Sequence, residues 1–551
     1  MALQALLLWP VLGLAAVWTL LSCVGLFRNY MAARQMGVPI RVLPIDHTNP
    51  IWMLIDRKLL SLLRRLPLPE SSFTRYNWRG WELADRYRSH HEMGDVFVHV
   101  TPGRNWLYLA DPDALMHVFR RRTDFPRCLE LTEILNVFGP NMSTVDGPKW
   151  KSQRKMVATC FNEQNNDIVW SESVRLASDM LKSWGSKPLL TSTAQDARTL
   201  SLLVLSRAGF GKSFKFEAHD ERRADGPTTS YKDSLQEILE NCILITALGP
   251  KFLAKPWLPR KFRRLHEACE SFQGHMTAMY EEEKRAFAQN RRSEDRNLMT
   301  SLVRASQDEA QTAEGLTESE IYGNIFVFNF AGHDTTTHTF TFALYFLAAV
   351  PSFQDWLSDE LRRVLGDRPP HEWDYSADFP RLKRCLAVML ETVRLYTPVP
   401  VAKWTGGESQ SLAVGEKVLV LPPKTMVIPS YSSVQTDPKT WGSDSLLWRP
   451  SRWIKTADWS DEELVTPRRG TFLGWSEGAP DCLGKKFSHV EFVATIATLF
   501  RDWRVDPVAA AGEGLDGARK RVLKQIEDDS AMVLLLQMLH PERSPLVWSK
   551  R

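Results

Sequence analysis

The hydrophobic pattern of this 551-residue chain changes sharply after its first segment. Residues 1–27, MALQALLLWPVLGLAAVWTLLSCVGLF, carry no charged side chain and are long enough to cross a ~30 Å hydrocarbon layer as one helix. Arg28, Arg34 and Arg41 follow, and such a basic flank places the following chain on the cytoplasmic side. A cleaved signal peptide is the alternative, but it usually has a basic start and a shorter apolar core. We therefore expect residues 1–27 to form an uncleaved membrane anchor.

The next segment, residues 28–71, mixes prolines with apolar and basic residues. This composition is typical of a stretch that lies along a membrane surface, although packing of its apolar residues into the protein core would explain it equally well. We expect residues 28–71 to be a membrane-proximal linker. No other uninterrupted apolar run of this length follows, so residues 72–551 are expected to form one catalytic domain.

Within that domain the periodicity of apolar residues distinguishes short strands from helices. Strands are predicted at 95–100 (DVFVHV), 105–110 (NWLYLA), 417–420 and 531–536. Helical periodicity dominates the remainder. The expected fold is mainly α with a minor β-sheet region.

Composition narrows the function. The chain is 44% apolar and 24% charged, as expected for a folded globular protein. Its formal net charge of +4 is too small for its length to indicate a nucleic-acid partner. The seven cysteines are scattered and form no CxxC pair, which argues against a disulfide framework or a cysteine-rich zinc site and favours a reducing compartment.

A long apolar run predicts a buried helix with a polar break at its centre. Thr317 and Glu320 form a capping-box pattern at its start. Its middle, FNFAGHDTTTHTF, contains Asp334, and buried polar groups are costly unless they are paired or used. Ala331 and Gly332 lack side-chain bulk and would let a flat ligand approach the backbone. A threonine-rich kink lined by water is the alternative, and Asp334 argues against a transmembrane helix.

Three charged residues and one cysteine further along the chain are candidate functional or structural residues. Glu391 and Arg394 are neighbours on a predicted helix face, where most such pairs are ordinary surface ion pairs, and Arg452 lies in WRPSRW. Cys482 lies in a glycine-rich loop before a predicted helix, whose N-terminus would stabilise a thiolate. A lone cysteine is usually a packing residue. In this loop it suits either a nucleophile or a metal ligand, and no partner histidine is identifiable.

Taken together, these segments resemble the cytochrome P450 family of haem–thiolate monooxygenases, in its microsomal form and close to fungal secondary-metabolism members. The resemblance covers the chain after the anchor and rests on motifs in the family's order. They are A-G-x-D-T-T at 331–336, E-x-x-R at 391–394, P-x-R-W at 450–453, G-x-x-x-C-x-G at 478–484, and a weaker W-x-x-x-R at Trp150 and Arg154.

The resemblance implies a P450 fold, a haem b cofactor and a role for each matched residue. Cys482 would be the thiolate ligand of the haem iron, with Gly478 and Gly484 allowing its loop to run close beneath the macrocycle. Asp334 and Thr335 would be catalytic, supplying protons during oxygen activation. A buried charge network that sets the cysteine loop would consist of Glu391, Arg394 and Arg452.

Two positions depart from the family pattern. Trp475 stands where most members have phenylalanine, and Pro480 stands where a basic residue usually binds a haem propionate. Haem anchorage would then depend on Trp150 and Arg154, with Lys403 as a further candidate. Weaker candidates are Arg468 and Arg469. Replacing Arg154 by alanine is accordingly expected to lower haem retention.

The implied reaction inserts one oxygen atom from O₂ into a lipophilic organic substrate, a secondary-metabolite intermediate. Electrons would come from an NADPH–cytochrome P450 reductase, with Lys485 and Lys486 on the docking face. The enzyme would be a single-pass protein of the endoplasmic reticulum with a cytosolic catalytic domain, and residues 247–262 would dip into the membrane. Residues near 131–144, 328–331 and 397–401 would line the pocket.

Two other functions remain open at this point. One is a haem–thiolate isomerase or dehydratase, against which Asp334 and Thr335 argue because such enzymes tend to lack this pair. The other is a non-enzymatic haem sensor or electron carrier, which does not explain a polar break beside an apolar pocket.

Overall fold

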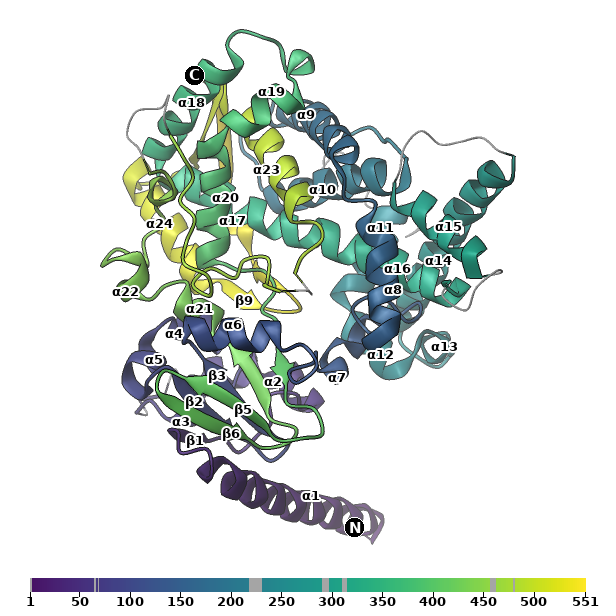
Figure 1. Cartoon of the computed structure of the whole chain (residues 1–551), viewed down its shortest axis with the longest axis vertical. Coiled ribbons are helices and arrows are strands. Elements are labelled where there is room, and N and C mark those ends of the chain that lie inside the picture. The colour runs from purple at the N-terminus through teal and green to yellow at the C-terminus, as the bar shows by residue number, and fades with distance from the viewer. Residues whose placement is uncertain are drawn as a thin grey trace.

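The computed structural model describes residues 2–63, 66–67, 69–217, 230–289, 297–309, 315–455, 462–478 and 481–551. Helices make up most of the molecule, and the largest sheet and the hairpin of β5 (Gln410–Val414) and β6 (Lys417–Leu421) lie at one end (Figure 1). The long helix α1 (Ala2–Arg34) projects from the sheet end, whereas the C-terminus lies at the opposite end. The prediction of a mainly α fold with a minor β region is confirmed.

The largest sheet joins distant parts of the chain in the order β1-β2-β3-β7-β4. Its strands are β1 (Ile40–Val42), β2 (Val96–Val100), β3 (Asn105–Leu109), β7 (Met426–Pro429) and β4 (Lys403–Trp404). The two pairs β2–β3 and β4–β7 are antiparallel, while β1–β2 and β3–β7 are parallel. The predicted strands at 95–100 and 105–110 are confirmed.

The predicted linker contributes to this domain. Its strand β1 pairs with β2, and its helix α2 (Pro50–Leu63) buries Trp52 and Leu60. The indole of Trp52 donates to the carbonyl of Asn77 at 2.8 Å. Some apolar residues of segment 28–71 therefore pack into the protein core, which was the alternative to a position along the membrane surface.

Three two-stranded sheets complete the β structure: β5 (Gln410–Val414) with β6 (Lys417–Leu421), β8 (Trp503–Pro507) with β11 (Leu546–Lys550), and β9 (Ser530–Met532) with β10 (Leu536–Met538). The strand at 417–420 is confirmed in β6. The single strand at 531–536 is wrong, because the chain turns back between β9 and β10. An unbroken apolar run shows no period that would reveal such a turn.

A bundle of long helices forms the core. It contains α10 (Thr193–Phe210), α20 (Lys383–Leu395) and α23 (Lys485–Phe500), which pack against the predicted polar-centred helix. A further long helix, α9 (Glu163–Gly185), packs on α10 and α23. The polar-centred helix is continuous but has three parts: α16 (Glu318–Asn329), a π-helical turn (Phe330–Asp334) and α17 (Thr335–Ala349). The capping box of Thr317 and Glu320 is present. The polar break therefore coincides with a local change of helix geometry, as π-turns often do at functional sites.

The shorter and peripheral helices surround this bundle. They are α3 (Ser72–Tyr76), α4 (Trp81–Asp85), α5 (Arg88–Met93), α6 (Pro112–Arg120), α7 (Leu129–Thr132), α8 (Gly147–Ala158), α11 (Tyr231–Glu240), α12 (Cys242–Leu248), α13 (Pro250–Leu253), α14 (Arg260–Ala288), α15 (Leu298–Glu309), α18 (Pro351–Leu365), α19 (Tyr375–Asp378), α21 (Tyr431–Val434), α22 (Pro438–Trp441) and α24 (Leu515–Asp528).

None of the helices in the described ranges combines the length and apolar character needed to pass through a membrane. Of the predicted anchor, Met1 and the side chains of residues 2–12, 14 and 15 lie outside the described part of the chain.

Candidate active site

A cavity of about 330 Å³ lies where the π-turn and α17 face the loop that precedes α23. It brings together eight residues singled out in the sequence: Trp150, Arg154, Ala331, Gly332, Thr335, Trp475, Cys482 and Gly484. They come from three segments that are far apart in the chain. The other predicted site residues do not line this cavity.

The cysteine loop is fixed by its own backbone. Gly478 has a φ of +77°, and a Cβ there would lie 2.8 Å from the carbonyl oxygen of Phe119, so glycine is required twice over. The backbone N–H of Cys482 donates to the carbonyl of Trp475 at 3.0 Å. Pro480 lies outside the described residues. Cys482 and Cys23 are exposed, whereas the other five cysteines are buried, which separates Cys482 from ordinary packing thiols.

Cys482 is exposed because it borders the cavity, but the protein atoms packed around its sulfur still desolvate it. This desolvation raises the pKa of Cys482, and the N–H of Gly484 together with the charges of Arg154 and Lys485 only partly oppose it. The N–H of Gly484 acts in the direction that the sequence predicted for a helix N-terminus, but desolvation of the anion has the larger effect on this pKa in the protein alone. A bound metal cation would reverse that balance, because a coordinating thiol loses its proton.

Asp334 and Thr335 point to different neighbours. The carboxylate of Asp334 pairs with Arg198 on α10 at 3.1 Å and lies 3.7 Å from Nε2 of His338. Burial alone would raise the pKa of Asp334, but the charges of His338 and Arg198 hold it well below its ordinary value. Thr335 lines the cavity, and its hydroxyl donates to the carbonyl of Ala331 at 2.8 Å. Of the predicted catalytic pair, Thr335 therefore lines the cavity, whereas the carboxylate of Asp334 faces α10.

Two further arginines, which the sequence did not reveal, lie beside Trp150 and Arg154. Arg127 lines the cavity and donates to the carbonyls of Met142 and Ser143 at 3.2 and 3.1 Å. The guanidinium of Arg122 stacks 3.4 Å above the Trp150 ring. No spacing in the sequence connects these arginines to the motifs, because only the tertiary fold brings the segment after α6 next to α8.

Lys403 lies behind Arg127 rather than in the cavity wall. Its strand β4 forms an isolated bridge with Arg127, and Lys403 itself is buried. Burial, together with the charges of Arg127 and Arg122, lowers the pKa of Lys403 to about 8. Burial also lowers the pKa of Arg127, with contributions from Arg122 and Arg154 against the pull of Asp146.

These cations outnumber the carboxylates beside them. Two acids are close: Asp146 pairs with Arg122, and Asp481 pairs with Arg154 at 2.5 Å. The excess positive charge suits the two propionates of a haem. The cavity next to the sulfur suits the macrocycle, because apolar side chains such as Leu205 and Phe487 line it together with Cys482. The residues present therefore fit a haem.

Glu391 lies at the centre of a separate, fully buried network. It accepts hydrogen bonds from both Arg394 nitrogens that face it, at 2.8 and 2.9 Å, and from Nε of Arg452 at 2.9 Å. The backbone N–H of Arg449 and the indole of Trp453 also donate to it, at 2.8 and 3.0 Å. The surface-pair reading is excluded, because Glu391 and Arg394 have no exposed side-chain area.

The structure also explains how this network reaches the cysteine loop. Arg394 donates to the carbonyl of Gln435 at 2.6 Å, and the Gln435 amide donates back to the carbonyl of Arg394 at 2.9 Å. The other end of that amide accepts the backbone N–H of Leu473 at 2.7 Å. Gln435, which no sequence motif marks, therefore ties the charge network to the segment leading to Cys482.

The two weaker candidates for haem anchorage, Arg468 and Arg469, are both exposed. Arg468 pairs with Asp113 at 2.7 Å, and both side chains are largely accessible to solvent. Neither arginine lines the cavity. The suggestion that they bind a propionate is not supported by this placement.

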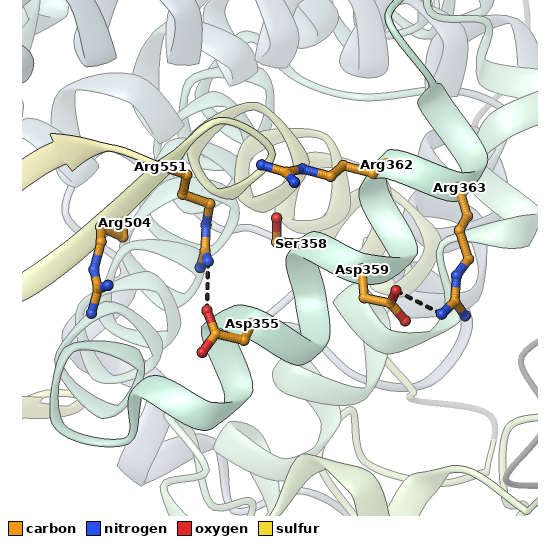
Figure 2. A pocket seen from close by; sticks show the side chains of 7 residues that line it. All are labelled: Asp355, Ser358, Asp359, Arg362, Arg363, Arg504 and Arg551. Carbon is orange, nitrogen blue, oxygen red and sulfur yellow. Dashed lines mark hydrogen bonds and ion pairs between the residues drawn. The ribbon is translucent and has the colours of Figure 1, made fainter.

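A larger hollow of about 650 Å³ lies on the surface between α18, β8 and the last residue. Figure 2 shows arginines around it, with Arg551 paired to Asp355 and Arg363 paired to Asp359. Arg504, on β8, pairs with Asp506. Its charges are thus largely matched within the protein, in contrast to those beside the cavity at Cys482.

The model of the family described as Cytochrome P450 matches residues 79–516. The chain belongs to the cytochrome P450 family. A cytochrome P450 monooxygenase of Arthrobotrys oligospora is 26% identical over 97% of both chains. The phomenoic acid biosynthesis cluster cytochrome P450 monooxygenase of Leptosphaeria maculans is 29% identical over 89% of this chain and 90% of its own. Ganoderic acid synthetase of Ganoderma lucidum is 24% identical over 81% of this P450 and 89% of its own length.

This P450 is accordingly an enzyme of the cytochrome P450 monooxygenase class. The matched region lies inside the predicted catalytic domain of residues 72–551 and contains every motif on which the resemblance rests. The exact boundaries at residues 27 and 71 stay predictions.

Proposed function

We propose that this P450 inserts one oxygen atom into a lipophilic organic substrate, with Cys482 as the thiolate ligand of a haem b. The observation that carries the proposal is the single cavity that joins Cys482 to Thr335 and to Trp150 and Arg154. A bound thiolate-ligated haem supplies the dioxygen chemistry, in which the second oxygen atom leaves as water.

The polar residues of the chain would hold the cofactor from one side. Arg127, Arg154 and the indole of Trp150 are placed to receive propionates, and Lys403 adds positive charge behind them. Bidentate arginine geometry suits carboxylates. The network around Glu391 would keep the cysteine loop in place through Gln435.

Proton supply would involve residues on both sides of the π-turn. The hydroxyl of Thr335 faces the cavity and can hold a water molecule there. Asp334 stays ionised between Arg198 and His338, so it would pass protons on rather than store one. The route would therefore enter from the side of α10.

The substrate pocket would be apolar with few polar groups. Parts of the three predicted segments line the cavity, among them Met142, Phe328, Pro398, Val399 and Val401. Such a wall favours a lipophilic ligand. A secondary-metabolite intermediate is supported by the relative from the phomenoic acid cluster, and its structure is left open.

Membrane attachment and the redox partner complete the proposal. Residues 1–27, which belong to α1 from Ala2 onward, would be the anchor in the endoplasmic reticulum, with the catalytic domain in the cytosol. Phe252 and Trp257 are exposed in the stretch proposed to dip into the membrane. Lys485 and Lys486 are exposed next to the cysteine loop, as expected for a docking face for an NADPH–cytochrome P450 reductase.

Glycosylation of Asn141 is a poor test of this orientation. Asn141 belongs to the sole N-x-S/T sequon, but its side chain is buried and donates to the carbonyls of Leu135 and Gly139. A folded chain would therefore leave Asn141 bare in either compartment.

The decisive experiment is the absorption spectrum of the reduced, carbon-monoxide-bound protein. The wild type is expected to give the strongly red-shifted Soret band of a thiolate ligand, and Cys482→Ala is expected to lose it. Cys160→Ala, at a buried cysteine, is the matched control and should keep the band. A haem-loaded wild type without this band would refute the proposal. If the band is present in the wild type, NADPH-dependent substrate turnover would distinguish a monooxygenase from an isomerase or an electron carrier.

A further inference from the structure

Trp475 introduces a hydrogen-bond donor beside the candidate thiolate. The backbone bond from Cys482 N–H to the Trp475 carbonyl, at 3.0 Å, closes the loop on which both residues lie. Both side chains line the same cavity. A phenylalanine ring at this place has no polar hydrogen, whereas an indole N–H is a donor that seeks an acceptor. The thiolate sulfur is one possible acceptor.

In the structure the indole has a different acceptor. Nε1 of Trp475 donates to Oγ of Ser488 at 3.1 Å, and Ser488 lies in the first turn of α23. The Ser488 hydroxyl in turn donates to the carbonyl of Lys485 at 2.8 Å. Because its single proton is used there, its lone pairs are left for the indole. The hydroxyl is thus oriented as an acceptor for Trp475.

Packing holds the indole in this orientation. The ring of His489 meets it at 84° with centroids 4.6 Å apart, and Phe472 contacts it at 67° and 6.0 Å. The Lys485 ammonium lies 5.8 Å from its centroid, within the range of a cation–π contact. Rotation of the ring toward the sulfur would disturb these contacts as well as the bond to Ser488.

We propose that Ser488 is a positioning residue that captures the indole N–H of Trp475 and so keeps it from donating to the sulfur of Cys482. This inference rests on the proposed function, since it concerns the haem ligand. A donor to a metal-bound thiolate withdraws electron density from it and favours the reduced metal. The Ser488 hydroxyl would therefore help to preserve the electron donation on which oxygen activation depends.

The test measures the haem reduction potential and the Soret position of the reduced carbon-monoxide complex in Ser488→Ala. Loss of the acceptor should move the potential to more positive values and the Soret band to shorter wavelength, as the indole turns to the sulfur. Ser488→Thr keeps a hydroxyl and should restore both values toward wild type. Thr498→Ala is the matched control, because Thr498 donates to a backbone carbonyl one turn away on the same helix without contacting Trp475.

A second background isolates the indole. In Trp475→Phe no N–H is present, so adding Ser488→Ala should leave potential and spectrum unchanged. An unchanged potential in Ser488→Ala alone, or an equal shift in the Trp475→Phe background, would overturn the proposal. If wild type itself lacked a thiolate-type spectrum, the proposed function would fail instead, so the two failures are distinguishable. Haem content and circular dichroism of each variant verify that the fold is retained.

Discussion

Two clusters of charged residues, one around Glu391 and one around Arg127, differ in whether every charge has a partner of opposite sign within the protein. Around Glu391, two arginines, an indole and a backbone N–H converge on one carboxylate with no exposed area. Beside the cavity, among the residues that the structure describes, the cations of Arg122, Arg127, Arg154 and Lys403 face only the carboxylates of Asp146 and Asp481. The first cluster is complete within the protein, and the second is short of negative charge.

This difference distinguishes a structural network from a binding site. A buried charge that has all its partners does not need a ligand. Removal of one partner leaves the remaining charges buried and uncompensated, which is destabilising. A cluster with lowered pKa values and unmatched cations is instead destabilising until an anion arrives. We infer that the Glu391 cluster contributes to folding, whereas the Arg127 cluster contributes to haem binding.

The largest effect is expected from breaking the complete cluster. Glu391→Gln should lower the free energy of unfolding by about 3–5 kcal/mol, because it strands Arg394 and Arg452 in the interior. Urea titration followed by circular dichroism measures this. Glu463→Gln, at an exposed residue that pairs with Lys455 at 3.4 Å, is the control and should cost less than about 1 kcal/mol. A similar small cost for both variants would contradict the comparison.

In the cluster around Arg127, removal of a cation should instead raise the free energy of unfolding of the haem-free protein. The pKa of Lys403 is about 8 in the fold against an ordinary value of 10.5. The unfolded chain therefore binds more protons over this interval, so the stability of the haem-free protein should rise with pH from about 8 to 10.5, by at most about 3 kcal/mol.

Lys403→Met should remove that rise and stabilise the haem-free protein below pH 8. Urea titrations of both proteins between pH 7.5 and 10 measure the difference. In the haem-bound wild type the rise should be smaller, because propionates would restore the missing negative charge. A haem-free wild type whose stability follows that of Lys403→Met at every pH would show that the lysine charge carries no cost.

Arg127 should matter for the cofactor more than for the fold. Loss of a charge-assisted hydrogen bond costs about 1.5–3 kcal/mol, so Arg127→Met should weaken haem binding by roughly 10- to 100-fold. The stability of the haem-free protein should change less, since the removal of a crowded, buried cation offsets the loss of its hydrogen bonds to the carbonyls of Met142 and Ser143. Haem titration of the haem-free variant, alongside its urea unfolding, tests both statements. Wild-type haem affinity in this variant would remove Arg127 from the proposed site.

The smallest effect is expected at Arg468. Its ion pair with Asp113 is exposed on both sides, so Arg468→Ala should change stability by less than about 0.5 kcal/mol. Haem content should equal that of wild type, because Arg468 does not line the cavity. Measured loss of haem would place this arginine nearer to the cofactor than its contacts indicate.

Local chemistry in the sequence was sufficient for several features. The capping box of Thr317 and Glu320 and the polar break at Asp334 identified the central helix, because both depend on residues close in the chain. The glycine-rich character of the loop around Cys482 was likewise evident from neighbouring residues, although the approach of Phe119 to Gly478 was not. Short strand-like runs identified β2 and β3, but the same criterion failed at 531–536, where an apolar run hides a turn.

The sequence by itself determined the family, the cysteine and the central helix, since each is encoded by short-range patterns. Only the tertiary structure decided that Arg127 joins Arg154, that Asp334 faces Arg198, and that Trp475 donates to Ser488. These pairings depend on how helices and loops pack across long separations in the chain. Because no local pattern records which distant side chains will meet, long-range contacts of this kind emerge only with the fold.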